Sequence, residues 1–477
     1  SLEGRWIVDT LDGEVEVTTV FELLKEESEN YKPETASEIT GVSAKVIEQT
    51  AKIFADADPG MIYAGYASCK WLHGDLLQRA MLLLLALTGS TGKEGGGLQI
   101  ANSPNARGLT QFGFSDVGPA FRLISSTTWD YDHADMKELN EKIYGNDLAE
   151  KFDRYYKKSI EEDWFPDYSK NGWKMGIFAG NNGANWRATG STWRKTAFEE
   201  LETIVSLAPD MGVTSLYSDY VLPIAHHYER NDLMLQSRVP YLQVLNEAVP
   251  PLGEAVDDWE ANRRLAEAIS RRAKERNIKP IQDAVDGRTV RRDYTKTLEL
   301  YTMGGRVNNS KDVAQFIINA SHGIPKISFE ELSQKGIVKV EGVENTMWEK
   351  DESPYHNEIV KSVKKKLPYE TFTGRQQFYI DHEWFIEFGE TLPTFKEPLE
   401  IDDFPLRMMM GHARHGIHST WRDDSFLLSL QRGEPDIYVN PDDAINRGVE
   451  DGDMIRIYNT AGEFFAMAHV SSGIQPG

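Results

Sequence analysis

The sequence predicts an α/β protein with parallel sheets, followed by a β-rich region at the carboxyl end. Three apolar segments are typical of strands: residues 174–179, 203–207 and 219–223. A helical pattern near 192–201 separates the first two, and an amphipathic helix over 257–274 follows the third. Strands and helices in this order form a parallel sheet covered on both faces. Ligands of such sheets bind at the carboxyl ends of the strands, so we expect a ligand near the turn GNNG at 180–183.

Composition excludes several kinds of protein. The 477 residues are 40% hydrophobic and 27% charged, as in a water-soluble globular protein of two to four domains. The formal net charge of −23 argues against general binding to nucleic acid or anionic membranes. Cys69 is the only cysteine, so this chain alone forms neither a disulfide nor a four-cysteine metal site.

Neither end of the chain has the pattern of a targeting segment. The longest apolar run, residues 80–87, is far shorter than the roughly 20 residues that cross a bilayer, so no direct membrane insertion is expected. The chain opens with SLEGRW, without an initiator Met or a signal-peptide pattern, and stops at IQPG. We therefore expect a piece of a longer protein.

Local signals predict the elements of the first part in order. The apolar residues of 37–56 recur at helical spacing, which predicts a helix, and 61–64 are typical of a short buried strand. Residues 74–88 are predicted to form a second helix that ends at a glycine-rich run. Residues 121–170 are rich in charged and aromatic residues and indicate one or two surface helices. We expect five regions: part of an α/β domain (1–120), a charged insertion (121–170), a further α/β domain (171–280), linking segments (281–400) and a β-rich domain (401–477).

Capping signals place the later elements. Ser328 and Glu331 form a capping-box pattern that opens a short helix, 361–366 is a basic run, and 377–380 is predicted as a strand. Asn440 before Pro441 begins another helix, which Gly448 ends. The segments 454–458 and 463–470 form a hairpin, and we interpret 401–477 as the first part of a β-barrel domain.

The most conspicuous polar cluster is GHARHGIHSTWRDD at 411–424. His412, His415 and His418 are three residues apart, a spacing that lets one ion collect all three rings on neither a helix nor a strand. A metal site, structural histidines and a loop that binds an anion or a polar cofactor all remain open, and Arg414 and Arg422 favour the last.

Five other positions each have a functional and a purely structural interpretation. The turn at 180–183 is either a plain turn or a phosphate-binding one, because glycines let backbone N–H groups approach an anion. Asp210 could read a base edge or cap a helix. Residues 381–383, DHE, could be metal ligands or a solvated strand end. Lys70 is a surface residue or a functional one, and the pair 226–227 could pack or react.

The order of motifs resembles the molybdopterin oxidoreductases of the dimethyl sulfoxide reductase family. The motifs are TGSTGKEGGG (88–97), GNN (180–182), SDYVLP (218–223) with Glu229 after it, the His412 loop, NPDDA (440–444) and GVEDGD (448–453). Three segments resemble its type II branch: GRQQFYIDHEW (374–384), GIHSTW (416–421) and LQRGEP (430–435). That branch holds nitrate, perchlorate, chlorate and selenate reductases, nitrite oxidoreductase, and dimethyl sulfide and ethylbenzene dehydrogenases.

The resemblance implies a fold and a cofactor. The fold would be Rossmann-like parallel-sheet domains, with 171–280 as the dinucleotide-binding domain, followed by a partial double-psi β-barrel in 401–477. The cofactor would be molybdenum held by two molybdopterin guanine dinucleotides, with Asn182 and Asp210 holding a dinucleotide and Asp210 reading its guanine. The loop residues that would donate to a pterin and its pyrophosphate are His412, Arg414, His415, His418, Ser419 and Thr420. A 4Fe-4S cluster and the residue that binds molybdenum belong to a part of the subunit absent from this chain.

The same resemblance implies a function. It is that of a catalytic alpha subunit that transfers an oxygen atom and two electrons to or from an oxyanion such as nitrate, nitrite, (per)chlorate or selenate, with Lys70 near the substrate. A hydroxylating dehydrogenase of a hydrocarbon or sulfide is the first alternative, and a non-catalytic paralogue or binding module is the second. The expected partners are an iron–sulfur beta subunit and, as a further candidate, a haem gamma subunit. The expected location is periplasmic, with the cytoplasm left open.

Overall fold

The computed structural model describes most of the chain. The residues described are 2–65, 68, 71–93, 95–99, 136–162, 173–186, 190–195, 197–235, 241–285, 288–321, 324–340, 358–369, 371–397, 403–409, 411, 424–430, 435–459 and 462–477. They form a mixed α/β protein with several small sheets, of which three contain parallel strand pairs.

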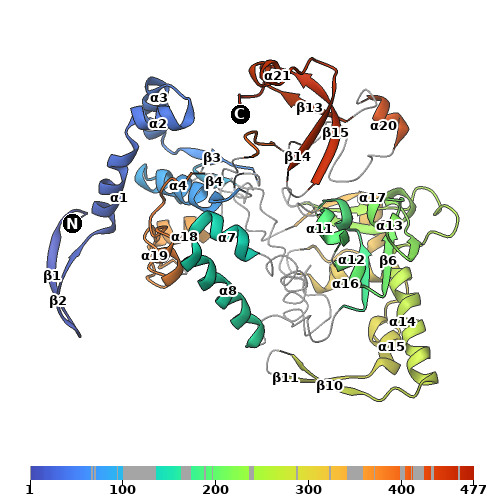
Figure 1. The fold of residues 1–477 in the computed structure, drawn as a ribbon. Helices are drawn as coiled ribbons and strands as arrows, with labels where there is room; N and C mark the ends of the chain where they lie inside the picture. Colours follow the sequence, from blue (N-terminus) through green and yellow to red (C-terminus); the bar gives the residue numbers. More distant parts are fainter. Residues whose placement is uncertain are drawn as a thin grey trace.

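A hairpin and three helices open the chain. Strands β1 (Arg5–Thr10) and β2 (Gly13–Thr18) pair antiparallel and extend away from the rest of the ribbon in Figure 1. Helices α1 (Val20–Ser28), α2 (Pro33–Thr40) and α3 (Ala44–Asp56) follow, with the 3₁₀ turn η1 (Glu29–Tyr31) after α1. The single helix predicted over 37–56 is wrong: Gly41 adopts the left-handed conformation, φ 71°, and ends α2. Helical periodicity continues across this break, so the pattern alone did not indicate it.

The first parallel pair is β3 (Met61–Tyr63) with β4 (Gly97–Gln99), and α4 (Gly74–Leu87) lies between them in sequence. The predicted strand and helix are confirmed, but β3 is not buried, since Met61 and Tyr63 are 52% and 64% exposed. Gly96 precedes β4 at a close backbone approach. A Cβ there would lie 2.6 Å from the backbone oxygen of Ser90, so only glycine fits.

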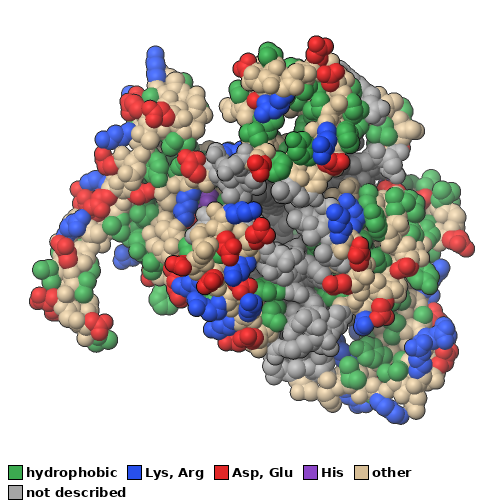
Figure 2. All heavy atoms as spheres, viewed as in Figure 1, with side chains coloured by type: hydrophobic (Ala, Val, Ile, Leu, Met, Phe, Trp, Pro, Cys, Tyr) green, Lys and Arg blue, Asp and Glu red, His purple; other side chains and the backbone are tan. Residues whose placement is uncertain are grey.

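The charged region contains two helices, as predicted. They are α7 (Met136–Tyr144) and α8 (Asn146–Glu161). Aromatic contacts join α8 to α19 (Glu383–Glu387) and its end: Phe152 stacks on Phe388 at 4.9 Å and Tyr155 on Trp384 at 5.2 Å. Figure 2 shows acidic and basic side chains interspersed over these helices and over much of the visible described surface, without a single large basic patch.

The central sheet confirms the predicted parallel arrangement. Its order is β5 (Met175–Ala179), β6 (Thr203–Ala208) and β7 (Tyr220–Pro223), all parallel. The short helices α10 (Gly183–Trp186), α11 (Gly190–Lys195) and α12 (Ala197–Glu200) separate β5 from β6, and α13 (Val213–Leu216) separates β6 from β7. The long amphipathic helix α14 (Asp258–Glu275) follows.

Both faces of the central sheet are covered because the side chains of β6 alternate between them. Ile204 packs with Trp193 and Phe198 of the α10–α12 segment, whereas Leu207 packs with Ile224 and with Ala261 of α14. Successive residues of a strand point to opposite faces. The two clusters therefore lie on opposite sides of β6 and fix the carboxyl ends of the three strands at one edge.

A second core lies beyond the central sheet. The antiparallel sheet β12–β9–β8 consists of β8 (Asp232–Leu235), β9 (Tyr241–Leu245) and β12 (Ile337–Lys339). Helices α16 (Ser310–Ala320) and α17 (Phe329–Lys335) pack on it through Leu242, Ile318 and Leu332, which are fully buried. The predicted capping box of Ser328 and Glu331 is confirmed at the start of α17. Between these elements lie β10 (Ile281–Val285), β11 (Arg288–Arg292), η4 (Tyr294–Lys296) and α15 (Thr297–Tyr301).

The strand predicted at 377–380 is wrong. This segment is irregular, and the backbone N–H of Ile380 donates to the carbonyl oxygen of Thr391 at 2.9 Å. Arg79 of α4 donates to the carbonyl oxygens of Phe378, Glu390 and Thr391 at 3.5, 2.7 and 2.8 Å. A half-buried guanidinium therefore satisfies backbone carbonyls of two loop segments that lie side by side.

The carboxyl-terminal region forms a small sheet. Helices α18 (Glu358–Lys365) and α20 (Ser425–Leu430) precede it, and its strands are β13 (Asp436–Val439), β14 (Met454–Asn459) and β15 (Gly462–Val470), in the order β13–β15–β14. The predicted hairpin is confirmed as β14–β15. Helix α21 (Pro441–Arg447) begins at the N-cap Asn440 and ends at Gly448, as predicted. Within the described part of 403–477 the strands form this open sheet, which Figure 1 shows at the top.

Candidate functional site

A cavity of about 590 Å³ lies at the carboxyl edge of the central sheet and is lined by residues at the ends of its three strands. Residues 180–182 follow β5, residues 206–210, 212, 214 and 215 form the end of β6 and the segment after it, and residues 224–227 follow β7. Arg230 and Asp258 complete this wall. A cavity of the size typical for small-molecule sites therefore lies where we expected a ligand to bind.

Asn182 ties the first strand end to the second. Its Oδ1 accepts hydrogen bonds from the backbone N–H of Thr214 at 2.9 Å and from the Thr214 hydroxyl at 2.7 Å. The same hydroxyl oxygen accepts from the backbone N–H of Ala184 at 3.1 Å. Thr214 is 2% exposed, so these bonds are made in a dry environment. The amide oxygen of Asn182 is therefore committed to the protein, and its Nδ2 group is what remains for a ligand.

Asp210 follows the second strand and is exposed at the cavity. The helix-cap interpretation of this residue is wrong, because the N-cap of α13 is Gly212, and the first-turn N–H of Thr214 donates to Asn182. The Asp210 carbonyl oxygen instead accepts from the Ser215 hydroxyl at 3.4 Å. Asn182 and Asp210 line the same cavity from adjacent strand ends.

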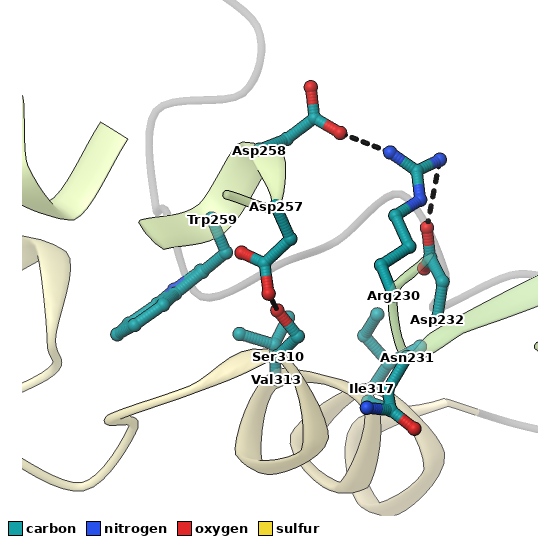
Figure 3. A pocket seen from close by; sticks show the side chains of 10 residues that line it. Arg230, Asn231, Asp232, Asp257, Asp258, Trp259, Ser310, Val313 and Ile317 are labelled. Carbon is teal, nitrogen blue, oxygen red and sulfur yellow. Dashed lines mark hydrogen bonds and ion pairs between the residues drawn. The ribbon is translucent and has the colours of Figure 1, made fainter. Parts of the chain in front are cut away.

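The third strand end contributes residues that the sequence did not single out as ligand contacts. His226, His227 and Arg230 line the cavity, and Arg230 pairs with two carboxylates, Asp258 of α14 and Asp232 of β8. Figure 3 shows the guanidinium between them, at the wall of a smaller neighbouring cavity of about 160 Å³. Partial burial, followed by the positive charge of Arg230 and then His226, holds the pKa of His227 below its usual range. The position of these three residues just after the third strand was the feature of the sequence that could have identified them as cavity residues.

Most of the other candidate residues cannot be placed. Lys70 and the six loop residues His412, Arg414, His415, His418, Ser419 and Thr420 lie outside the described residues. The DHE segment is not a strand end: His382 is the N-cap of α19, and its Nδ1 accepts from the backbone N–H of Trp384 at 3.2 Å. Within the part of the chain that the structure describes, no three His, Cys, Asp or Glu side chains gather to hold a metal ion.

Comparison with known families identifies the chain. The family model described as molybdopterin oxidoreductase matches residues 18–268, more than half of the sequence and the whole central sheet. The chain belongs to the molybdopterin oxidoreductase family. A second model, the molybdopterin dinucleotide binding domain, matches residues 406–477 at the carboxyl end.

Relatives of the family share the whole length of this chain. It is 33% identical to a respiratory nitrate reductase subunit alpha of Haloferax mediterranei, 34% to a perchlorate reductase subunit alpha of Dechloromonas aromatica and 32% to a dimethylsulfide dehydrogenase subunit alpha of Rhodovulum sulfidophilum. All of this chain aligns in each case, with 50%, 51% and 52% of those proteins. The chain therefore spans about half the length of these relatives.

A solved structure supports the fold. Acetylene hydratase from Pelobacter acetylenicus superimposes with a TM-score of 0.60 over 96% of this chain and 58% of that one, at 19% sequence identity. None of the helices in the described residues has the length and apolar character needed to cross a membrane.

Proposed function

We propose that this chain is part of a catalytic subunit that holds molybdenum through two molybdopterin guanine dinucleotides. The proposed reaction is two-electron oxygen-atom transfer on an oxyanion. The observation that carries the proposal is the cavity at the carboxyl edge of β5, β6 and β7, with Asn182 and Asp210 at neighbouring strand ends. Family membership supports the cofactor, and the alpha-subunit relatives that are named for nitrate and perchlorate reduction support the substrate class.

The cavity fits one nucleotide part of such a cofactor. Small residues line it, including Gly180, Ala208 and Gly212, so the backbone is accessible to a ligand. The carboxylate of Asp210 would accept hydrogen bonds from the N–H groups of a guanine edge, and Asn182 would donate from Nδ2. When bound, the molybdenum centre supplies the two-electron chemistry, while the protein orients the cofactor and substrate.

Residues outside the described part complete the proposal. Six loop residues would donate to a pterin and its pyrophosphate: His412, Arg414, His415, His418, Ser419 and Thr420. Charge-assisted bonds of this kind suit a dianionic group. Lys70 would stabilise negative charge on the substrate. The closing sheet β13–β15–β14 would belong to a double-psi barrel, and a 4Fe-4S cluster would lie elsewhere in the full subunit.

The wider assembly follows from the same proposal. Electrons would be exchanged with an iron–sulfur beta subunit, with a haem gamma subunit as a further candidate, in periplasmic anaerobic respiration: they would enter from it when an oxyanion is reduced and leave to it when a substrate is oxidised. Hydroxylating oxidation of a sulfide or hydrocarbon is the second candidate function, and the dimethylsulfide dehydrogenase relative favours it at nearly equal identity. Assays of the purified complex with reduced viologen plus nitrate or perchlorate, and with an oxidised acceptor plus dimethyl sulfide, separate the two.

The cofactor proposal is tested by Asp210→Ala in the full-length subunit. Removing a charged acceptor for guanine costs about 1.5–3 kcal/mol of binding, so molybdenum content and guanine nucleotide released by acid should fall together. Asp12→Ala, in the exposed turn between β1 and β2, is the matched control and should leave both unchanged. Unchanged cofactor content in Asp210→Ala would remove Asp210 from the site. A wild-type subunit without molybdenum or tungsten would favour a non-catalytic binding module.

A further inference from the structure

The third strand end carries a charged network that the proposed function leaves unused. Arg230 is the one arginine or lysine among the described residues that line the cavity, and its side chain is 17% exposed. Its Nη1 group pairs with Asp258, and its Nη2 group lies 3.5 Å from Asp232. Figure 3 shows both carboxylates facing the guanidinium. A ligand anion would therefore find the charge of Arg230 already offset by two carboxylates, so the arginine is poorly suited to bind it directly.

The network acts instead on the neighbouring imidazole. Nη2 of Arg230 lies 3.5 Å from Nδ1 of His227. A guanidinium donates hydrogen bonds and cannot accept them, so Nδ1 must be the acceptor and must carry no proton. The ring proton of neutral His227 then resides on Nε2. Partial burial, Arg230 and His226 keep the pKa of His227 below its usual range, against weaker opposing effects of Asp232 and Asp258.

Because His227 lines the cavity, the Nε2–H group of this tautomer can donate a hydrogen bond to a ligand there. His227 lies in the segment after β7, and Asn182 and Asp210 lie in the segments after β5 and β6, so the three residues line the cavity from three adjacent strand ends. The first two were assigned to the base of a dinucleotide. An extended nucleotide lying across the sheet edge would reach the third strand end with its phosphates.

We propose that His227 binds the phosphate part of the nucleotide as a neutral donor through Nε2–H, and that Arg230 is a positioning residue that fixes this tautomer. The proposal rests on the proposed function, because it needs a nucleotide in the cavity. It assigns the phosphate end of the ligand to the β7 side of the cavity.

The test is nucleotide binding to the cofactor-free full-length subunit, measured by calorimetry. GDP-glucose is the probe because its pyrophosphate, a diester, does not titrate near neutral pH, and guanosine is the probe without phosphate. His227→Phe keeps a ring but loses the donor, so it should weaken GDP-glucose binding by about 10- to 100-fold, the effect of losing a hydrogen bond to a charged group. Guanosine binding should not change. His227→Gln, whose amide can donate, should recover most of the loss.

Arg230→Gln tests the positioning role by a pH profile. Loss of its positive charge raises the pKa of His227, so GDP-glucose binding should tighten more steeply in this variant than in the wild type as the pH falls from 8 to 6. A structural role alone would weaken both probes equally at every pH. That result, or equal binding by His227→Phe and wild type, would overturn the proposal.

Failure of the proposed function has a different signature. If Asp210 does not read guanine, Asp210→Ala will not reduce the preference for GDP-glucose over ADP-glucose, whatever His227 does. If neither guanosine nor GDP-glucose binds the wild-type subunit, both proposals are wrong. If His227→Phe loses the tighter binding of GDP-glucose over guanosine but keeps the preference for guanine over adenine, the assignment of His227 to the phosphate is supported.

Discussion

Replacement of Asn182 by alanine should loosen the edge of the central sheet where the cavity lies. The substitution removes the oxygen that accepts from the Thr214 N–H at 2.9 Å and from its hydroxyl at 2.7 Å. Each bond contributes about 1 kcal/mol, and a buried donor left without a partner costs about 1–3 kcal/mol. Because Asn182 lines the cavity, water can enter and satisfy part of this need. We therefore expect a net cost of about 2–3 kcal/mol.

Hydrogen exchange is the appropriate measurement, because a chain with several cores need not unfold in one step. A cost of this size corresponds to a roughly 30- to 150-fold increase in local exchange rate, expected at Thr214 and in the rest of α13. Peptides covering 203–216 of the full-length subunit would report it by mass spectrometry. Exchange in α16, which belongs to the separate second core, should stay unchanged.

Two control variants isolate the cause. Asn182→Asp keeps an acceptor for both bonds, so exchange should stay within about threefold of wild type, but it replaces the Nδ2 donor by negative charge and should lower cofactor retention. Asn181→Ala alters an exposed neighbour that lines the same cavity and should leave exchange unchanged. If Asn182→Ala exchanges within threefold of wild type, the bonds to Thr214 do not stabilise this edge and the reasoning is refuted.

The remaining predictions concern turnover, packing and pH. If Lys70 stabilises negative charge on the substrate, Lys70→Ala in the intact enzyme should cut turnover about 10²-fold with molybdenum content unchanged. A change below threefold would show that Lys70 is an ordinary surface residue. Gly96→Ala should lower the melting temperature clearly, because its Cβ would lie 2.6 Å from a backbone oxygen, whereas Gly65→Ala meets nothing within 4 Å and should not. Arg263 lowers the pKa of Glu260 to about 2, so this carboxylate stabilises the fold above its ordinary pKa of 4.5, and the contribution disappears as the pH falls toward 2. Glu260→Gln should therefore lower the melting temperature at pH 7 and less at pH 3; an equal effect at both values would contradict this.

The location of the candidate site could be predicted from the sequence, but not all of its residues could. The location at the carboxyl edge of a parallel sheet was predictable, because it follows from the order of strands and helices. The presence of Asn182 and Asp210 at that edge followed from the same order. Their roles as cofactor contacts stay predictions. The third strand end was underestimated, because the three-residue spacing of His227 and Arg230 does not show that the guanidinium will also meet Asp258 of α14.

The sequence by itself determined the features that depend on neighbouring residues. The caps at Ser328 and Asn440 and the glycine that ends α21 are all satisfied within a few residues along the chain. Such contacts have a fixed spacing, so a pattern of residue types is enough to indicate them.

Tertiary structure alone decided which groups satisfy one another over long distances. Arg79 donates to the carbonyl oxygens of Phe378, Glu390 and Thr391, about 300 positions away. Asn182 is turned toward Thr214, and Arg230 reaches Asp258 of α14 at the cavity wall. Buried polar groups must find a partner, but the partner is chosen by how the elements pack, and no spacing in the sequence records that choice.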